Sequence, residues 1–301
     1  MPAGGQAGPA AAGGQVSSEF VLTLPCPDRV GIVHAVAAYL HEAGCNVLDS
    51  QQFGDRIAGR FFMRVHVETV GADTTYGALR TGFATVAAEY GMDWQLHDLA
   101  VQPRALIMVS KAGHCLNDLL YRRAAESLRV DIPLVIGNHP DLAPLAAAHG
   151  VPFEHIGVDG SAGSAQRAEA RLLGLVSELG IDFVVLARYM RILSPALCAK
   201  MTGRIINIHH SFLPSFKGAR PYHQAHAHGV KLIGATAHYV TADLDEGPII
   251  EQEVARVDHS DSPGDLAAIG RDAERVALAR AVRWHAEHRV LLHGRRTVIF
   301  R

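Results

Sequence analysis

Apolar residues recur along the first hundred positions with a period that changes from one segment to the next. Alternating or short continuous apolar runs are typical of strands, whereas a 3.6-residue recurrence is typical of a helix. Prolines on either side of Cys26 predict a turn at residues 25–29. The pattern predicts strands at 20–24, 46–53, 59–68 and 93–101 and helices at 30–41 and 75–90. This β-α-β-β-α-β order is that of a ferredoxin-like unit.

The rest of the chain alternates short apolar runs with helical segments. Such alternation predicts a mainly parallel sheet that helices cover on both faces. We therefore expect an α/β fold in which a Rossmann-like sheet follows the smaller ferredoxin-like unit. The strands are expected at 104–109, 132–137, 153–157, 183–187, 204–209 and 236–240, with an edge strand at 297–300, and the helices at 116–127, 142–149, 165–179 and 263–288.

The length of the chain supports this division. At 301 residues it exceeds the usual size of one hydrophobic core, and its 49% of apolar residues can build two. Residues 1–17 are mostly Gly, Ala, Pro and Gln and are expected to be a flexible leader. The small domain should then occupy 18–101, a linker 102–104, and the larger domain 105–301.

Charge and cysteine content exclude several kinds of partner. The 28 basic and 30 acidic residues nearly cancel, which argues against nucleic acid. Four scattered cysteines without a C-x-x-C pair fit reduced thiols better than disulfides or a zinc site. No apolar stretch reaches the roughly 18 residues that span a bilayer. We expect a cytoplasmic protein that binds neither nucleic acid nor a membrane.

Two segments, 204–214 and 238–248, gather the polar residues best suited to catalysis. Side chains alternate between the two faces of a strand, so Asn207 and His209 should point to the same side. Pro214 cannot continue a central strand, so the pair should lie near its carboxyl end, where open α/β sheets bind ligands. The first segment therefore predicts a site at this edge of the sheet.

Asp245 lies in a turn-rich loop of the second segment and is the best candidate to meet His209. A carboxylate favours the imidazolium form and fixes the ring, while the amide of Asn207 can donate to a developing oxyanion. Such a group indicates chemistry at a carbonyl carbon. A lone Asn or His at a strand end is more often a structural polar group, and it is the combination of the three residues in two motifs that favours a site.

These motifs resemble those of the folate-dependent formyltransferase family. The resemblance rests on Asn207-Ile-His209, on Ser211-Phe-Leu-Pro214 and on Leu244-Asp245-Glu-Gly-Pro248, and it covers nearly the whole chain from Glu19 onward. It implies a formyltransferase fold for the larger domain. It also implies that Asn207, His209 and Asp245 act on the formyl group of 10-formyltetrahydrofolate.

Four further stretches are similar to the family members that hydrolyse this folate rather than transfer its formyl group. They are 110–115, 187–193, 217–224 and 270–274. The resemblance implies release of tetrahydrofolate and formate, with formate supplied to purine synthesis and the one-carbon folate pools kept in balance. It implies neither a cofactor nor a metal. The residues expected to bind the substrate are Met190, Arg191, Ile192, Leu193, His238, Leu244 and Gly247.

The segment Pro25-Cys-Pro-Asp-Arg-Val-Gly-Ile-Val33 is similar to the opening of an ACT domain, a small module that binds amino acids. The resemblance implies an effector such as glycine or methionine, bound by Asp28, Gly31 and Asn46. It also implies a homo-oligomer. A purely structural or dimerising module is the alternative.

The remaining motifs give weaker evidence for a function. The loop 157–163 lacks the glycine spacing of a dinucleotide or phosphate site, and His223, His226 and His228 lack the spacing of a metal site. The stretch 110–115 has a single glycine where a ribonucleotide phosphate would need a glycine-rich cradle, which favours water as the formyl acceptor. Two other functions stay open, namely formyl transfer to an amine and a folate- or amino-acid-sensing binding protein.

Overall fold

The computed structural model describes residues 17–70, 74–213 and 221–301. Contacts divide the chain into two compact units, one ending at Ala100 and the other beginning at Val101. We call them the N-terminal and the C-terminal unit. Residues 1–16 of the expected leader and Lys217–Arg220 of the quoted 217–224 stretch lie outside the described residues. Arg104, expected in a linker, belongs to a strand of the large sheet, where its backbone N–H donates to Asp182 Oδ2 at 2.7 Å.

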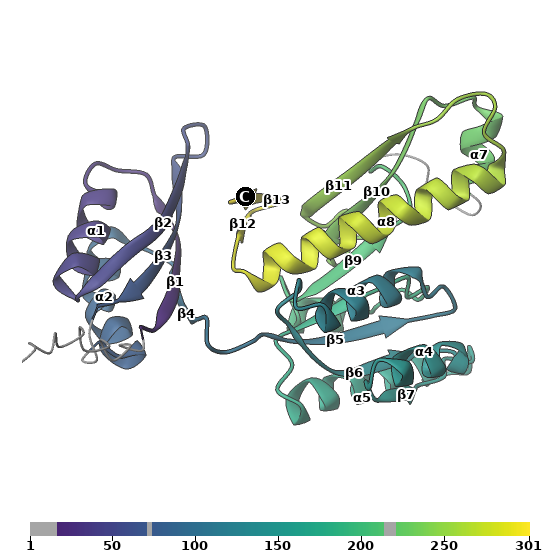
Figure 1. Cartoon of the computed structure of the whole chain (residues 1–301), viewed down its shortest axis with the longest axis horizontal. Coiled ribbons are helices and arrows are strands. Elements are labelled where there is room, and N and C mark those ends of the chain that lie inside the picture. The colour runs from purple at the N-terminus through teal and green to yellow at the C-terminus, as the bar shows by residue number, and fades with distance from the viewer. Residues whose placement is uncertain (1–16, 71–73, 214–220) are drawn as a thin grey trace, which may run out of the picture. The chain divides into compact units, whose positions relative to one another are not determined.

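The N-terminal unit is a four-stranded antiparallel sheet with order β2-β3-β1-β4 (Figure 1). One face of the sheet packs against two helices through a core that includes Leu22, Leu24, Met63 and Phe83. The β-α-β-β-α-β prediction is confirmed. The elements are β1 (Glu19–Pro27), α1 (Ile32–Glu42), β2 (Cys45–Asp55), β3 (Arg60–Thr69), α2 (Tyr76–Tyr90) and β4 (Gln95–Asp98).

The turn expected at 25–29 begins later than predicted, because Pro25 and Pro27 still belong to β1. β4 pairs with β1 only from Phe20 to Thr23. Beyond Thr23 that side of β1 is an edge, where a proline without an N–H group costs no ladder hydrogen bond.

The C-terminal unit contains a seven-stranded sheet with order β11-β10-β9-β8-β5-β6-β7. The five strands from β9 to β7 in this order are parallel, and β10 and β11 are antiparallel additions at one edge. The expected mainly parallel sheet is therefore confirmed. The strands are β5 (Arg104–Val109), β6 (Asp131–Gly137), β7 (Phe153–His155), β8 (Phe183–Leu186), β9 (Ile205–His209), β10 (Leu232–Tyr239) and β11 (Ile249–Arg256).

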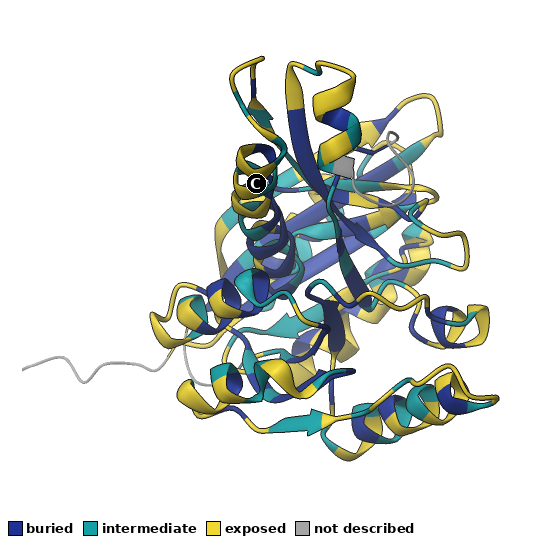
Figure 2. Ribbon diagram, turned by 90° about the vertical axis from the view of Figure 1, so that its right-hand side faces the viewer, coloured by how far each residue is buried: buried dark blue, intermediate teal, exposed yellow. Residues whose placement is uncertain are grey.

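Helices cover both faces of this sheet. One face, with Val109, Val185 and Ile208, packs on α3, α4 and α8, and the other, with Met108 and Val184, packs on α5 and α6. Figure 2 shows the central strands mostly in the colour of buried residues. The helices are α3 (His114–Ala124), the 3₁₀ turn η1 (Pro140–Leu142), α4 (Ala143–Ala148), α5 (Ser164–Glu178), α6 (Pro195–Lys200), α7 (Pro221–Ala227) and α8 (Pro263–Ala286).

Several elements differ from the sequence expectations. The strand expected at 297–300 is β13 (Arg296–Ile299), which forms a separate hairpin with β12 (Val290–His293) instead of an edge of the large sheet. β11, β12 and α6 were not predicted. β11 contains three consecutive polar residues, Glu251-Gln-Glu253, and this interrupts the apolar alternation that marks a strand.

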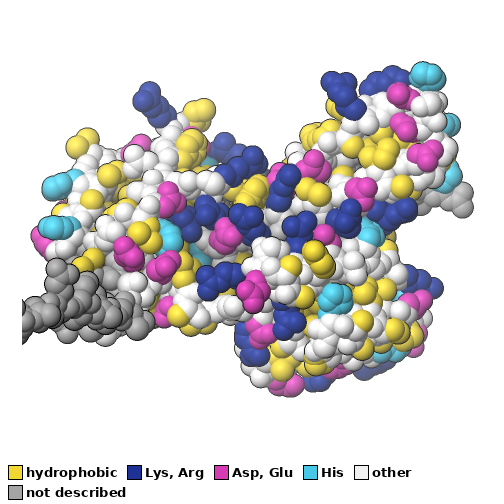
Figure 3. All heavy atoms as spheres, viewed as in Figure 1, with side chains coloured by type: hydrophobic (Ala, Val, Ile, Leu, Met, Phe, Trp, Pro, Cys, Tyr) yellow, Lys and Arg dark blue, Asp and Glu magenta, His cyan; other side chains and the backbone are white. Residues whose placement is uncertain are grey.

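The surface and the thiols match the composition. On the face shown in Figure 3, basic and acidic side chains are interspersed over both units. All four cysteines are free and buried, Cys26 and Cys45 in the N-terminal unit and Cys115 and Cys198 in the C-terminal unit. Within the described ranges, the helices are too short or too polar to cross a bilayer.

Candidate active site

The carboxyl ends of β5 and β8 flank the point where the path of the chain across the sheet reverses. From β5 the chain continues through α3 to β6 and β7, and then returns through α5 to β8 on the other side of β5. Helices that leave neighbouring strands in opposite directions open a crevice at such a point. The backbone N–H of Met190 donates to Ser110 Oγ at 2.9 Å and links the two strand ends.

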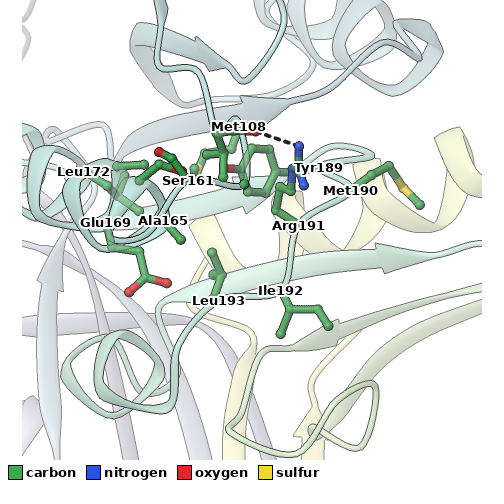
Figure 4. A pocket seen from close by; sticks show the side chains of 14 residues that line it. Met108, Ser161, Ala165, Glu169, Leu172, Tyr189, Met190, Arg191, Ile192 and Leu193 are labelled. Carbon is green, nitrogen blue, oxygen red and sulfur yellow. Dashed lines mark hydrogen bonds between the residues drawn. The ribbon is translucent and has the colours of Figure 1, made fainter.

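Two adjoining cavities lie at this edge. The segment 189–193 lines both of them. The larger, of about 440 Å³, extends between this segment and α5 (Figure 4). The smaller, of about 260 Å³, is lined by the ends of β8, β9 and β10 and by residues 240–245, and it includes Asn207, His209, His238, Leu244 and Asp245.

His209 and Asp245 lie next to each other in the lining of the smaller cavity. Nδ1 of His209 lies 3.3 Å from Oδ2 of Asp245, and both side chains are largely buried. A carboxylate accepts, so Nδ1 of the ring carries a proton. The hydrogen bond from His209 lowers the pKa of the Asp245 carboxyl, although burial acts in the opposite direction. Within the part of the chain described, Nε2 of His209 is buried and makes no hydrogen bond, which leaves it for a ligand.

Asn207 shares the face of β9 with His209 and is oriented by His238. Nδ1 of His238 lies 2.9 Å from the carbonyl oxygen of Tyr239, so Nδ1 must carry a proton. Burial lowers the pKa of His238, which keeps the ring neutral and makes Nε2 an acceptor. The amide Nδ2 of Asn207, 3.2 Å away, therefore donates to it. The second Nδ2 hydrogen of Asn207 is available to a bound oxygen atom.

The loop after β10 places Asp245 by two unusual backbone features. Asp245 itself adopts a left-handed conformation with φ of 57°. Gly247 does not line either cavity, but a Cβ atom there would overlap the carbonyl oxygen of Tyr239. The close backbone approach explains why glycine stands here, because only glycine permits it. The predicted role of Gly247 in binding substrate stays a prediction. Leu244, by contrast, lines the smaller cavity as expected.

The segment Met190–Leu193 joins the two cavities, as its predicted binding role requires. Nη2 of Arg191 donates to the carbonyl oxygen of Val158 at 2.8 Å, the dashed bond in Figure 4. Val158 belongs to the loop 157–163, whose glycine spacing does not fit a phosphate site. The structure nevertheless brings this loop to the site, because Val158, Gly160 and Ser161 line the larger cavity.

The three residues expected to bind an amino acid lie apart within the chain. Asp28 and Gly31 flank the start of α1, where Gly31 has a φ of 98°. Asn46 is the second residue of β2, beyond the other end of α1, and its Nδ2 donates to Glu68 Oε1 at 2.8 Å. Residue 46 and the turn are separated by about the length of β2, roughly 30 Å at 3.3 Å per residue. One chain alone does not bring them together.

Arg188, His210 and Glu274 near the site were not singled out from the sequence. Arg188 and His210 line the smaller cavity, and Glu274 is buried behind it in α8. The ring of His210 stacks on that of His209 with centroids 5.0 Å apart. A usable signal existed, since Arg188 and Glu274 both lie within stretches that carry the family resemblance.

One group has the spacing of metal ligands, namely His114, Cys115 and Glu274, with donor atoms within 4.8 Å of one another. Two features disfavour a cation there. The guanidinium of Arg188 lies 3.3 Å from the Glu274 carboxylate. Burial raises the pKa of the Cys115 thiol, so the thiolate that binds metals is suppressed. His223, His226 and His228 are exposed on or just after α7.

Known protein families match both units of the chain. The formyl transferase family model matches residues 103–282, and the ACT domain model matches 20–81. A formyltetrahydrofolate deformylase from Corynebacterium sp. (strain P-1) is 51% identical over 93% of this chain and 98% of its own length. The crystal structure of a formyltetrahydrofolate deformylase from Burkholderia mallei has 52% identity and a TM-score of 0.89, over 94% of this chain and all of that one.

A glycinamide ribonucleotide transformylase from Symbiobacterium toebii is more distant, with 32% identity and a TM-score of 0.63. It covers 69% of this chain and 98% of its own, so it matches a part and not the whole of the two-unit architecture. The deformylases, in contrast, align over both units. The chain therefore belongs to the formyltetrahydrofolate deformylase family.

Proposed function

We propose that this protein hydrolyses 10-formyltetrahydrofolate to tetrahydrofolate and formate. The observation that carries the proposal is the group Asn207, His209 and Asp245, which lines one cavity in a chain of this family. Water oxygen forms a bond to the formyl carbon and the bond from that carbon to N10 breaks. N10 takes one proton, and the other leaves as formic acid ionises.

The three side chains have different roles in this reaction. The formyl oxygen gains negative charge as water adds, and Asn207 Nδ2 and His209 Nε2 are the available donors for it. Asp245 keeps the ring of His209 oriented, and its carboxylate lines the same cavity and can position the attacking water. Each oxyanion donor in such a site contributes on the order of 10²–10³-fold in rate.

We place the pterin ring in the larger cavity, against the backbone of Met190–Leu193. That cavity is lined mainly by apolar side chains and by peptide groups that can bond the edge of a flat heterocycle. The formyl group would then reach the smaller cavity that shares this segment. The scheme uses no cofactor and no metal, so turnover should be unchanged after exhaustive treatment with EDTA.

Water is the proposed acceptor. The space beside β5 is occupied by side chains of the 110–115 stretch, with His114 bonded to Glu274 at 2.7 Å. The test is formate release from 10-formyltetrahydrofolate with no amine present, and again with glycinamide ribonucleotide added. Equal rates are expected. Formylated ribonucleotide formed as fast as formate would make the protein a transferase.

For the N-terminal unit we propose an amino-acid effector, with glycine and methionine as candidates, in a cytoplasmic homo-oligomer. Because Asp28 and Gly31 lie far from Asn46 in one chain, an amino acid touching all three would have to bind between two copies. Light scattering and formate release, each titrated with both amino acids, test this. Unchanged mass and rate would leave the unit a structural module.

A further inference from the structure

Arg188 has an unusual backbone and an unusual position. It lies two residues beyond the end of β8 and has a φ of 64°. Glycine adopts this left-handed conformation freely, whereas it costs a residue with a long side chain about 1 kcal/mol or more. Its side chain is only 18% exposed and lines the smaller cavity with Asn207, His209 and Asp245. A strained residue whose side chain is directed into a cavity is a candidate for function.

The charge of Arg188 is balanced from behind by Glu274. The Arg188 Nε atom lies 3.3 Å from Oε2 of this carboxylate, which is 1% exposed. Glu274 is held from two further sides, by His114 Nε2 at 2.7 Å and by the Tyr222 hydroxyl at 3.1 Å. Burial would raise the pKa of Glu274, but its hydrogen bond from His114 and the charge of Arg188 lower it, so the carboxylate stays ionised.

This support leaves the outer part of the guanidinium unused. Among the described residues, no hydrogen bond is formed by the side chain of Arg188, and Nε is buried without one. Arg188 also lies close enough to His210 to help burial lower the pKa of that ring to about 4. His210 therefore stays neutral near pH 7, and the fixed positive charge on this wall of the cavity is that of Arg188.

The chemistry of the site says which ligand suits this charge. Hydrolysis produces an anion at the reacting carbon, because the second oxygen turns the formyl group into a carboxylate. Transfer to an amine would leave a neutral formamide. A planar guanidinium matches the two oxygens of a carboxylate, and the match is strongest where water is excluded.

We propose that Arg188 is the anion-binding group of the site and takes the carboxylate of formate, and that Glu274 is the positioning residue that holds it there. This rests on the proposed hydrolysis. The guanidinium stabilises the charge that spreads over both oxygens as the bond to N10 breaks, and it retains formate until release. Formate should therefore bind to the free protein and inhibit turnover.

The experiment measures formate binding apart from turnover. Sodium formate is titrated into the full chain and followed by calorimetry, with sodium chloride at equal ionic strength as reference, and formate inhibition of turnover is measured in parallel. In Arg188→Gln the inhibition constant for formate should rise at least 10-fold and kcat should fall, whereas Arg188→Lys, which keeps the charge, should recover part of both. Arg283→Gln on the exposed side of α8 is the matched control and should change neither.

Two further variants keep the test decisive. Arg188→Gly suits the left-handed backbone, so it should melt at a higher temperature than Arg188→Gln while losing formate binding to the same extent. Glu274→Gln keeps a group of the same shape and should weaken formate binding with little change in the KM for the folate. If formate binds the Arg188 variants as tightly as wild type, the inference is wrong even though hydrolysis stands. If wild type binds formate through Arg188 but releases none from the folate, the subsite stands and the proposed hydrolysis is wrong.

Discussion

The imidazole of His209 is held on one side by Asp245 and presents its other nitrogen, Nε2, to the cavity. Replacing either group removes an interaction that strengthens as charge develops on the formyl oxygen. Asp245→Asn and His209→Ala should therefore lower kcat by at least 10²-fold and leave KM nearly unchanged. Steady-state kinetics with a thermal melt of each variant check this.

The control is Glu246→Gln, which alters the neighbouring carboxylate. Glu246 bonds Arg295 at 3.2 Å and does not line the cavity, so its variant should keep wild-type kcat. More than a tenth of wild-type kcat in Asp245→Asn would contradict the role given to this residue.

In the proposed mechanism, His238 acts on the oxyanion through Asn207. A leucine there fills the buried space but cannot accept the hydrogen bond from the Asn207 amide, whose direction is then lost. His238→Leu should lower kcat and kcat/KM by the same factor, about 10-fold or more, as expected for an interaction made in the transition state. A rise in KM alone would mean that His238 serves folate binding instead.

At the level of residues, sequence reasoning found those that lie close together in two short motifs. Asn207 with His209, and Asp245 in its Gly-Pro loop, could be predicted because strand alternation and turn chemistry are local. Arg188 and Glu274 could not be paired in this way. Their contact joins a loop after β8 to the middle of α8, and no local period relates them.

At the scale of the elements, the backbone of the loop between β10 and β11 is held close to β10. Gly247 lies so close to β10 that a methyl group on it would overlap the carbonyl oxygen of Tyr239. The backbone N–H of Tyr239 in turn donates to the carbonyl oxygen of Pro248 at 2.9 Å. Gly247→Ala should displace the loop and with it Asp245. We expect a loss of more than 10²-fold in kcat and a lower melting temperature, measured together.

The matched variant is Gly229→Ala, at a glycine with φ of 60° and open space around its Cβ position. It carries backbone strain but no clash, and it lies away from the cavities, so activity should persist. Equal loss of activity in the two variants would mean that strain, and not the approach to β10, explains the glycine at 247.

The elements that sequence reasoning missed share a physical cause. β11 contains Glu251, whose buried carboxylate is paired with the guanidinium of Arg280 at 3.6 Å. A polar residue in this strand is therefore not necessarily exposed. Pro25 and Pro27 fit in β1 because β4 ends earlier. Both depend on neighbours distant in sequence, whereas the βα alternation that predicted the sheet is repeated along the chain.

For the whole molecule, two partly buried histidines predict a loss of stability in acid. Burial, helped by a nearby arginine, lowers the pKa of His97 in the N-terminal unit and of His210 in the C-terminal unit from 6.5 to about 4. The unfolded chain therefore takes up these protons first as the pH falls. Stability should be complete above about pH 6.5 and decline towards pH 4, by up to about 3 kcal/mol for each histidine.

Urea unfolding between pH 7 and 4 measures this loss. His97→Gln and His210→Gln should each flatten the decline relative to wild type, while His226→Gln, at an exposed position, should not. Parallel curves for wild type and the His97 and His210 variants would show that the acid lability has another source.

Because the four thiols are buried, the chemical labelling of each one measures how often the unit that contains it opens. A thiol reagent cannot reach Cys26 or Cys45 unless the N-terminal unit opens, nor Cys115 or Cys198 unless the C-terminal unit does. The labelling rate of each cysteine, resolved by peptide mass, therefore gives the opening free energy of its own unit without any introduced probe. An effector that binds the N-terminal unit would slow modification of Cys26 and Cys45, and any slowing at Cys115 and Cys198 would measure how much of that stabilisation reaches the catalytic half.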